Sequence, residues 1–287
     1  MNTATRLSLY GISLVGVFAV AFFGGRALIP DDTVAGWTKR ADEASQDHDS
    51  MESGHEMTEV GGLSVEEGGY RLVTVSAPQR AGENGELSFR ILDPSGDPLT
   101  RYETSHEKQL HLITVRSDGS SFEHVHPELN QETGTWSIPW SWPEGGSYRL
   151  YADFVPADSP SVGDLVLGQG LEVAGRFEPV AKPLSRTDSV AGFEATLSGE
   201  LKAGSTSHLT ARIMRGGKQV TDLEPYLGAA GHLVALREGD LGYLHVHAEE
   251  GELDFQAEVP TPGRYLMYLD FKVDGRVHTA EFVLEAK

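Results

Sequence analysis

Residues 109–116 read QLHLITVR and residues 122–126 read FEHVH, and the same pair of strings returns as GHLVALR at 231–237 and YLHVH at 243–247. Both copies continue alike, with GGSYRLYADF in the first and PGRYLMYLDF in the second. Self-similarity on this scale indicates a duplicated domain. The sequence therefore predicts two homologous domains, at 63–175 and 189–287, joined by a proline-containing linker at 176–188.

Each copy alternates short apolar runs with Gly, Pro and Asp turns and shows no amphipathic helix, which is typical of an all-β domain. About seven strands per copy is the count of an immunoglobulin-like sandwich, and the Gly-x-Tyr pattern at Tyr148 and Tyr265 resembles its tyrosine corner. The expected fold is all-β, with two tandem immunoglobulin-like β-sandwich domains preceded by one N-terminal transmembrane helix. The strands expected in the first copy are 70–77, 86–92, 110–116, 121–126, 135–140, 147–155 and 165–173.

The composition excludes several classes of protein. The 287 residues include no cysteine, so disulfides, thiolate nucleophiles, iron–sulfur clusters and cysteine-ligated zinc are all excluded. The formal net charge is −20, which repels phosphate backbones and argues against a nucleic-acid partner. Cations are the natural small partners, and any metal must be bound by His, Met or carboxylate.

The N-terminal segment has the character of a membrane anchor. Residues 7–25 carry no charge and approach the length of about 20 residues that crosses a bilayer. A cleaved signal peptide is the alternative, but its apolar region is shorter and ends in small residues of the Ala-x-Ala type, whereas Gly24-Gly25-Arg26-Ala27-Leu28-Ile29 is a poor cleavage site. We expect residues 1–30 to be an uncleaved single-pass anchor in the cell membrane, with the bulk of the chain outside the cytoplasm.

Residues 31–62 are polar and acidic and lack apolar periodicity, which predicts a flexible tether. His48, Met51, His55 and Met57 are interleaved there with carboxylates. Imidazole and thioether suit copper in its two oxidation states, so the tether is a candidate for metal capture. A solvated acidic linker with incidental His and Met is the alternative interpretation.

Three histidines per copy carry the clearest chemical signal. If Asp118 and Gly119 form a two-residue type I′ turn, the hairpin places His111 opposite His126, with His124 on the same face. Three imidazoles then converge. The second copy repeats the spacing and predicts an equivalent set at His232, His245 and His247.

Each set lies where an apolar face of the hairpin ends. A trio of neutral imidazoles at such an edge is a candidate site for copper or zinc, with one position left open for water or an incoming ligand. The third and sixth strands of the sandwich are neighbours, so Asp153 is expected near His111 and Asp270 near His232, as a fourth ligand or as a carboxylate that orients an imidazole. His106 lies close by in the first copy only. Hydrogen-bonded structural histidines are the alternative. The apolar residues of these faces are Ile113, Val115 and Phe122 in the first copy and Val234, Leu236 and Tyr243 in the second.

At these residues the chain resembles a group of membrane-anchored or secreted bacterial proteins, common in actinobacteria, with tandem sandwich domains that carry His-Leu-x-x-Val-Arg and then Phe-x-His-Val-His-Pro. The resemblance covers residues 70–287 approximately and implies an extracytoplasmic protein associated with heavy metals or copper. This chain departs from the group at Ala248, where proline is expected. The architecture is more loosely similar to periplasmic copper-resistance carriers, whose amino-terminal ligands are absent here.

Together these patterns predict a membrane-tethered protein that binds, buffers or delivers copper, with zinc as the alternative metal and a membrane or extracytoplasmic protein as a further partner. We expect a binding protein and not an enzyme, since no phosphate-binding loop or nucleophile elbow is found. Two other classes remain open. One is an adhesion or interaction module with structural histidines, and the other is a metalloenzyme that uses His111, His124 and His126 with an open coordination position.

Overall fold

The computed structural model describes residues 60–244, 246–248 and 253–287. The described residues all belong to one compact unit. The expected anchor, His48, Met51, His55 and Met57 of the tether, and His245 lie outside the described residues. Within the described ranges, no helix is long and apolar enough to span a membrane.

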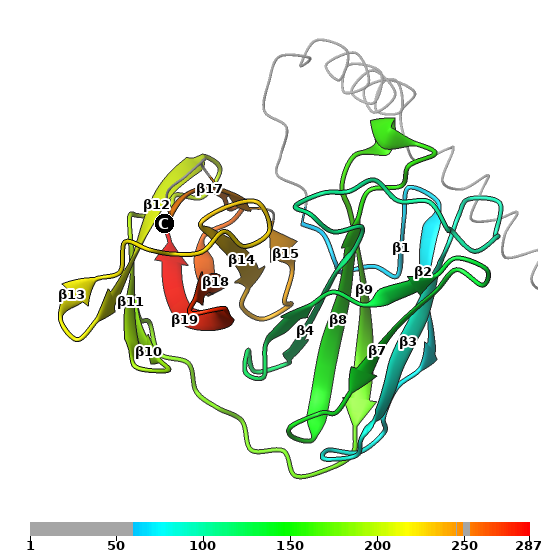
Figure 1. The fold of residues 1–287 in the computed structure, drawn as a ribbon, viewed down its shortest axis with the longest axis horizontal. Helices are drawn as coiled ribbons and strands as arrows, with labels where there is room; N and C mark the ends of the chain where they lie inside the picture. Colours follow the sequence, from blue (N-terminus) through cyan, green and yellow to red (C-terminus); the bar gives the residue numbers. More distant parts are fainter. Residues whose placement is uncertain (1–59, 245, 249–252) are drawn as a thin grey trace, which may run out of the picture. The chain divides into compact units, whose positions relative to one another are not determined.

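The first repeat consists of two antiparallel sheets, β1-β2-β3-β7-β6 and β5-β4-β8-β9 (Figure 1). All seven expected strands are present, and the structure adds the two short strands β1 and β6. The bounds in the first sheet are Glu66–Glu67 (β1), Tyr70–Ser76 (β2), Gly85–Leu92 (β3), Thr135–Trp140 (β7) and Glu128–Asn130 (β6). Those in the second sheet are Glu123–Val125 (β5), His111–Arg116 (β4), Gly146–Phe154 (β8) and Leu165–Val173 (β9), with a 3-10 turn at Pro160–Val162 before β9.

The second repeat has the same plan, with sheets β10-β11-β12-β17-β16 and β15-β14-β18-β19 and with β13 paired to β12. The prediction of two tandem immunoglobulin-like sandwiches is confirmed. The bounds in the first sheet are Thr187–Val190 (β10), Phe193–Ser198 (β11), Thr206–Arg215 (β12), Lys218–Gln219 (β13), Asp254–Glu258 (β17) and Val246–Ala248 (β16). Those in the second are Tyr243–Leu244 (β15), Gly231–Arg237 (β14), Gly263–Val273 (β18) and Arg276–Ala286 (β19).

Both repeats contain the expected tyrosine corner. The Tyr148 hydroxyl donates a hydrogen bond to the Glu144 carbonyl at 2.9 Å. The Tyr265 hydroxyl donates to the Thr261 carbonyl at 2.7 Å. In each case the acceptor lies four residues upstream, so the phenol closes the loop before the strand as it does in immunoglobulin-like domains.

One sheet of each repeat is buried on both faces. Every residue of β4 is buried, whereas β12 in the opposite sheet of the second repeat alternates between exposed and buried positions. Leu110 and Leu112 point into the core of the first sandwich. The side chains on the opposite face of β4 belong to a separate apolar cluster that contains residues of both repeats. The apolar faces predicted beside the histidines thus pack against each other, between the repeats. This cluster, the inter-repeat core, contains Ile113, Val115, Phe122, Tyr151, Val166, Val234, Leu236, Leu241, Tyr243, Leu266, Tyr268 and Val283.

Contacts between the repeats occur in reciprocal pairs. Tyr151 and Tyr268 occupy equivalent positions, and the hydroxyl of each donates to a backbone carbonyl in the hairpin turn of the other repeat, Leu241 and Gly119 respectively, both at 2.6 Å. Tyr268 also stacks on Phe122 with ring centroids 4.0 Å apart, and the equivalent rings of Tyr151 and Tyr243 lie 5.7 Å apart. The repeats therefore meet as the two subunits of a two-fold symmetric dimer do, through the same surface on each.

The last residues of the predicted tether take part in the contact between the two repeats. Gly61 and Tyr243 exchange two backbone hydrogen bonds of 3.0 Å, and the Gly62 N–H donates to the Val166 carbonyl at 2.7 Å. Gly62 has φ of 70°, and a Cβ there would lie 2.4 Å from the Tyr151 ring. Only glycine fits this backbone without strain, so residues 60–62 form a strand-like link between β15 and β9.

The turn between β4 and β5 differs from the expected two-residue type. The Gly119 N–H donates to the Arg116 carbonyl and the Arg116 N–H donates to the Ser120 carbonyl, which defines a three-residue turn with Gly119 at φ 79°. Ser121, at φ 53°, adds an irregular residue on the second strand. Because the longer turn shifts the pairing by one residue and Ser121 shifts it back, Ile113 still pairs with His124 as predicted.

Asp118 in this turn connects the hairpin to the linker between the domains. Its carboxylate accepts hydrogen bonds from the Arg116 guanidinium at 2.9 and 3.0 Å and from the Val180 N–H at 2.8 Å. Burial by itself would raise the pKa of Asp118, but the bonds from Arg116, Val180 and Ser120 outweigh it and hold the pKa well below its ordinary value of 3.8. The ionised form is therefore the one that stabilises the fold.

We expect Asp118→Asn to lower the free energy of unfolding by about 2 kcal/mol at pH 7, since it leaves the buried Arg116 with one carboxylate partner fewer. A depressed folded-state pKa contributes stability that is present above the ordinary pKa and is lost as the pH falls through the folded value. The difference between variant and wild type should therefore shrink below about pH 4. Urea denaturation of the full chain between pH 7 and pH 3 measures it, and a pH-independent difference would contradict the assignment.

Candidate functional site

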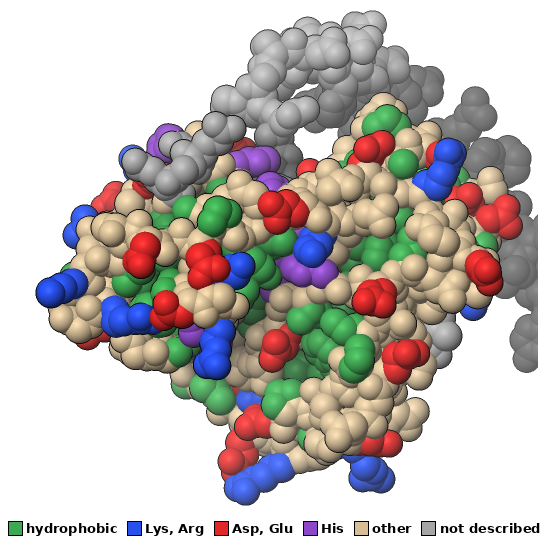
Figure 2. All heavy atoms as spheres, in the orientation of Figure 1, with side chains coloured by type: hydrophobic (Ala, Val, Ile, Leu, Met, Phe, Trp, Pro, Cys, Tyr) green, Lys and Arg blue, Asp and Glu red, His purple; other side chains and the backbone are tan. Residues whose placement is uncertain are grey.

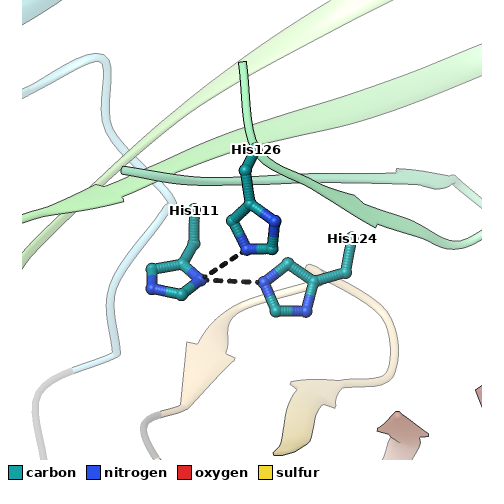
Figure 3. Close-up of side chains that lie close together, drawn as sticks. All are labelled: His111, His124 and His126. Carbon is teal, nitrogen blue, oxygen red and sulfur yellow. Dashed lines mark hydrogen bonds between the residues drawn. The ribbon is translucent and has the colours of Figure 1, made fainter. Parts of the chain in front are cut away.

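His111, His124 and His126 lie close together at one end of the β4–β5 hairpin (Figure 3). Each ring offers one nitrogen to a common point, and these three nitrogens all lie within 4.8 Å of one another. His111 Nδ1 is 3.0 Å from His124 Nε2 and 3.2 Å from His126 Nε2. The convergence follows from the register, because His111 begins β4 and His124 and His126 occupy alternate positions along the opposing segment. We refer to these three residues as the His trio.

In two of the rings, the nitrogen that points away from the trio has a hydrogen-bond partner that determines the tautomer. His111 Nε2 lies 3.2 Å from the Ser105 carbonyl oxygen, and His124 Nδ1 lies 2.8 Å from Asp270 Oδ2. A carbonyl or an ionised carboxylate only accepts, so each ring donates its hydrogen outward. The inward nitrogens of His111 and His124 then face each other at 3.0 Å, and His126 Nε2 lies 3.2 Å from the same His111 nitrogen. Either a hydrogen carried by one of these rings or a metal ion held between them can bridge these nitrogens.

The spacing of the inner nitrogens suits a metal ion. A tetrahedral ion with metal–nitrogen distances of about 2.0–2.1 Å places its ligand nitrogens about 3.3 Å apart. The separations of 3.0 and 3.2 Å from His111 Nδ1 are close to that value. The trio therefore needs only small side-chain movements to take an ion.

His111 and His124 are shielded from water, and burial holds His126 neutral. His111 is 4% exposed and the side chain of His124 is 1% exposed. Burial, followed by the neighbouring His124, His111 and Lys108, lowers the pKa of His126 to about 3. A neutral imidazole is the form that ligates metal, so His126 is in its ligating form at neutral pH.

The second repeat contributes to the same cluster. Asp270 on β18 lies opposite His232 in the sheet register, as predicted, but its side chain meets the trio of the first repeat. It is 2% exposed, and its second carboxylate oxygen accepts a 2.6 Å hydrogen bond from Thr279. The His232 ring centroid is 5.0 Å from that of His124 and 5.8 Å from that of His111. The candidate site is therefore made by both repeats.

The other residues predicted for the metal sites are not part of the His trio. Asp153 lies opposite His111 in the register, as expected, and accepts a 3.0 Å hydrogen bond from the hydroxyl of Tyr243. Burial and this carboxylate raise the pKa of Tyr243 well above its usual range. His247 is exposed on β16, opposite Gln256 of β17. His106 is exposed in the loop before β4, with its ring centroid 5.5 Å from that of His232.

Sequence reasoning missed three parts of the site. The Ser105 carbonyl and the Thr279 hydroxyl orient the ring of His111 and the carboxylate of Asp270. The Tyr226 ring of the second repeat lies 6.5 Å from that of His126, and burial and Asp270 raise the pKa of Tyr226 to about 12. A backbone carbonyl and contacts between repeats leave no signal in residue spacing.

One family model matches this chain in two segments, residues 64–167 and 188–287. The chain belongs to the family described as Domain of unknown function (DUF8832). The matches fall one in each repeat, so the chain contains two DUF8832 segments in tandem. The description names no metal, and the association with copper therefore stays a proposal. A comparison with curated proteins gives no match.

Solved structures with similarity to this chain include three proteins with about 10–15% identity. The ICAM-5 D1-D4 ectodomain fragment is 15% identical with a TM-score of 0.23, and the match covers 76% of this chain and 53% of that one. The Escherichia coli adhesin FdeC is 14% identical with a TM-score of 0.26, covering 76% and 64%. The tandem Ig repeats of Dlar are 10% identical with a TM-score of 0.22, covering 75% and 97%. This chain spans less than two thirds of the first two, and these similarities concern the fold alone.

Proposed function

We propose that this protein binds one transition-metal ion at the His trio, copper in the first place and zinc as the alternative. It acts as a membrane-tethered extracytoplasmic protein that binds, buffers or delivers the ion. The observation that carries this proposal is the convergence of three ring nitrogens, one each from His111, His124 and His126, which lie within 4.8 Å of one another. The other nitrogen of His111 lies at the Ser105 carbonyl and that of His124 at Asp270, so these two rings are held with their remaining nitrogens turned toward the trio.

The chemistry of the donor set supports copper. Three imidazoles suit copper and zinc, and for a given nitrogen site divalent copper binds most tightly in the first-row series. The bond from His124 to Asp270 is the carboxylate–histidine arrangement that orients a ligating ring and raises its basicity. The burial of His111 and His124 favours holding an ion over turning over a substrate, so a binding role accounts for the site better than a metalloenzyme does.

An interaction module with structural histidines is the second candidate. It is favoured by the outward hydrogen bonds of His111 and His124, which also hold the β4–β5 hairpin against its own loop and against the second repeat. The solved structures of similar fold include an adhesin, which describes that protein only. This candidate predicts a folded chain without stoichiometric metal.

Metal content separates the two candidates. We expect the detergent-solubilised full chain to retain one ion per chain in elemental analysis, to lose it to a strong chelator and to bind one equivalent of Cu²⁺ or Zn²⁺ again in calorimetry. Deleting residues 31–59 should weaken binding less than about threefold, because a flexible tether loses conformational entropy when it closes around an ion and a preformed site does not. The deletion stops before residue 60 because Gly61 and Gly62 bond to both repeats. Metal-free protein, or binding that disappears with the tether, would overturn the proposal.

A further inference from the structure

We propose that His106 and His232 form the entry route by which a metal ion reaches the His trio. This inference rests on the proposed function and deepens it, because it assigns a kinetic role to two histidines that need not ligate the ion in its final position.

The two residues connect the surface to the trio in order of decreasing exposure. His106 is exposed, His232 is half-buried, and His111 and the His124 side chain are 4% and 1% exposed. Histidine side chains reach the surface on the face drawn in Figure 2. An ion that arrives in solution therefore meets an exposed imidazole before it meets the buried ones.

The separations permit transfer from ring to ring. The centroid of His106 lies 5.5 Å from that of His232 and 6.1 Å from that of His111, and His232 lies 5.0 Å from His124. Two imidazoles that share an ion have centroids about 5 Å apart, given metal–nitrogen distances of about 2.0–2.1 Å. Each step is then a ligand exchange in which one imidazole replaces water or the previous imidazole, without a change of oxidation state.

The turn that holds His106 also touches the trio. Ser105 and Lys108 exchange two backbone hydrogen bonds of 2.8 and 3.0 Å around His106 and Glu107, and the Ser105 carbonyl orients the His111 ring. The same short loop therefore holds the exposed imidazole of His106 and orients the buried imidazole of His111.

The second repeat has the same turn without the histidine. Tyr226 and Ala229 exchange the equivalent two bonds, with Leu227 at φ 55° where His106 has 47°. Leucine is thus already accommodated in this left-handed conformation in this very fold. His106→Leu removes the imidazole with the least disturbance of the backbone.

The test is the rate of metal loading and release in the full chain. Stopped-flow absorbance with a chromophoric chelator that competes for Cu²⁺ gives the association and dissociation rate constants and their ratio. We expect His106→Leu to lower both constants by the same factor, on the order of tenfold, because an outer site raises the local concentration of the ion without changing the final complex. The dissociation constant should not change. His232→Gln is expected to slow both steps likewise.

Glu107→Gly is the matched control, since it places glycine where Gly228 stands in the second repeat and keeps the imidazole. Its rates should equal those of the wild type. Unchanged rates in His106→Leu would overturn the entry route. A weaker equilibrium affinity with an unchanged association rate would also overturn it, because His106 would then be a ligand of the final site. Failure of the wild type to bind Cu²⁺ at all would instead reject the proposed function.

Discussion

Replacing His124 and His126 together by alanine is expected to abolish stoichiometric metal binding in the full chain. The change removes two of the three nitrogens that lie within 4.8 Å of one another and leaves His111 as a single buried donor. Because the affinity of a protein metal site depends on the number of preorganised ligands, we expect the dissociation constant to rise by at least about a thousandfold. Calorimetry with Cu²⁺ and with Zn²⁺ measures the loss.

The repeat-equivalent change His245→Ala with His247→Ala is the matched control. His247 is exposed on β16, and His232 of the second set meets the trio of the first repeat. The control variant should therefore keep one tightly bound ion. If it lost an equivalent, a separate site in the second repeat would be required, and if the first variant kept full stoichiometry, the trio would have to be reassigned to a structural role.

Asp270→Asn is expected to weaken metal binding by about 10–100-fold, although the residue belongs to the other repeat and does not touch the ion. The asparagine amide can present either its oxygen or its nitrogen to His124 Nδ1, so the ring loses the fixed tautomer that directs Nε2 toward the site. Competition titration against a chelator of known affinity gives the change.

Asp153→Asn separates this effect from damage to the interface. Asp153 is the equivalent carboxylate, is also buried between the repeats, and accepts its hydrogen bond from Tyr243. Both variants should lower the thermal midpoint of the full chain, since both change a buried carboxylate, but only Asp270→Asn should change the affinity for metal. Equal losses of affinity in the two variants would mean that metal binding depends only on how well the repeats pack.

The local part of the site could be predicted from the sequence because it depends on short-range rules. The alternation of β4 predicted the face shared by His111, Ile113 and Val115, and that face is the one observed. The pairing of Ile113 with His124 followed from the positions of the strands around a Gly-containing turn. The predicted turn type was wrong, since the loop has three residues, yet the irregular residue Ser121 restored the register.

What the sequence determined by itself is thus the duplication, the strands, the register of each hairpin and the convergence of the His trio. Only the tertiary structure decided what covers the apolar face beside it. A strand pattern shows that a face is apolar, but not whether it packs against the opposite sheet or another domain. The reciprocal contacts of Tyr151 and Tyr268 close the two faces on each other and bring Asp270 to His124. Residue spacing carries no information about that contact, because the contact depends on how the surfaces of two separately folded domains fit together.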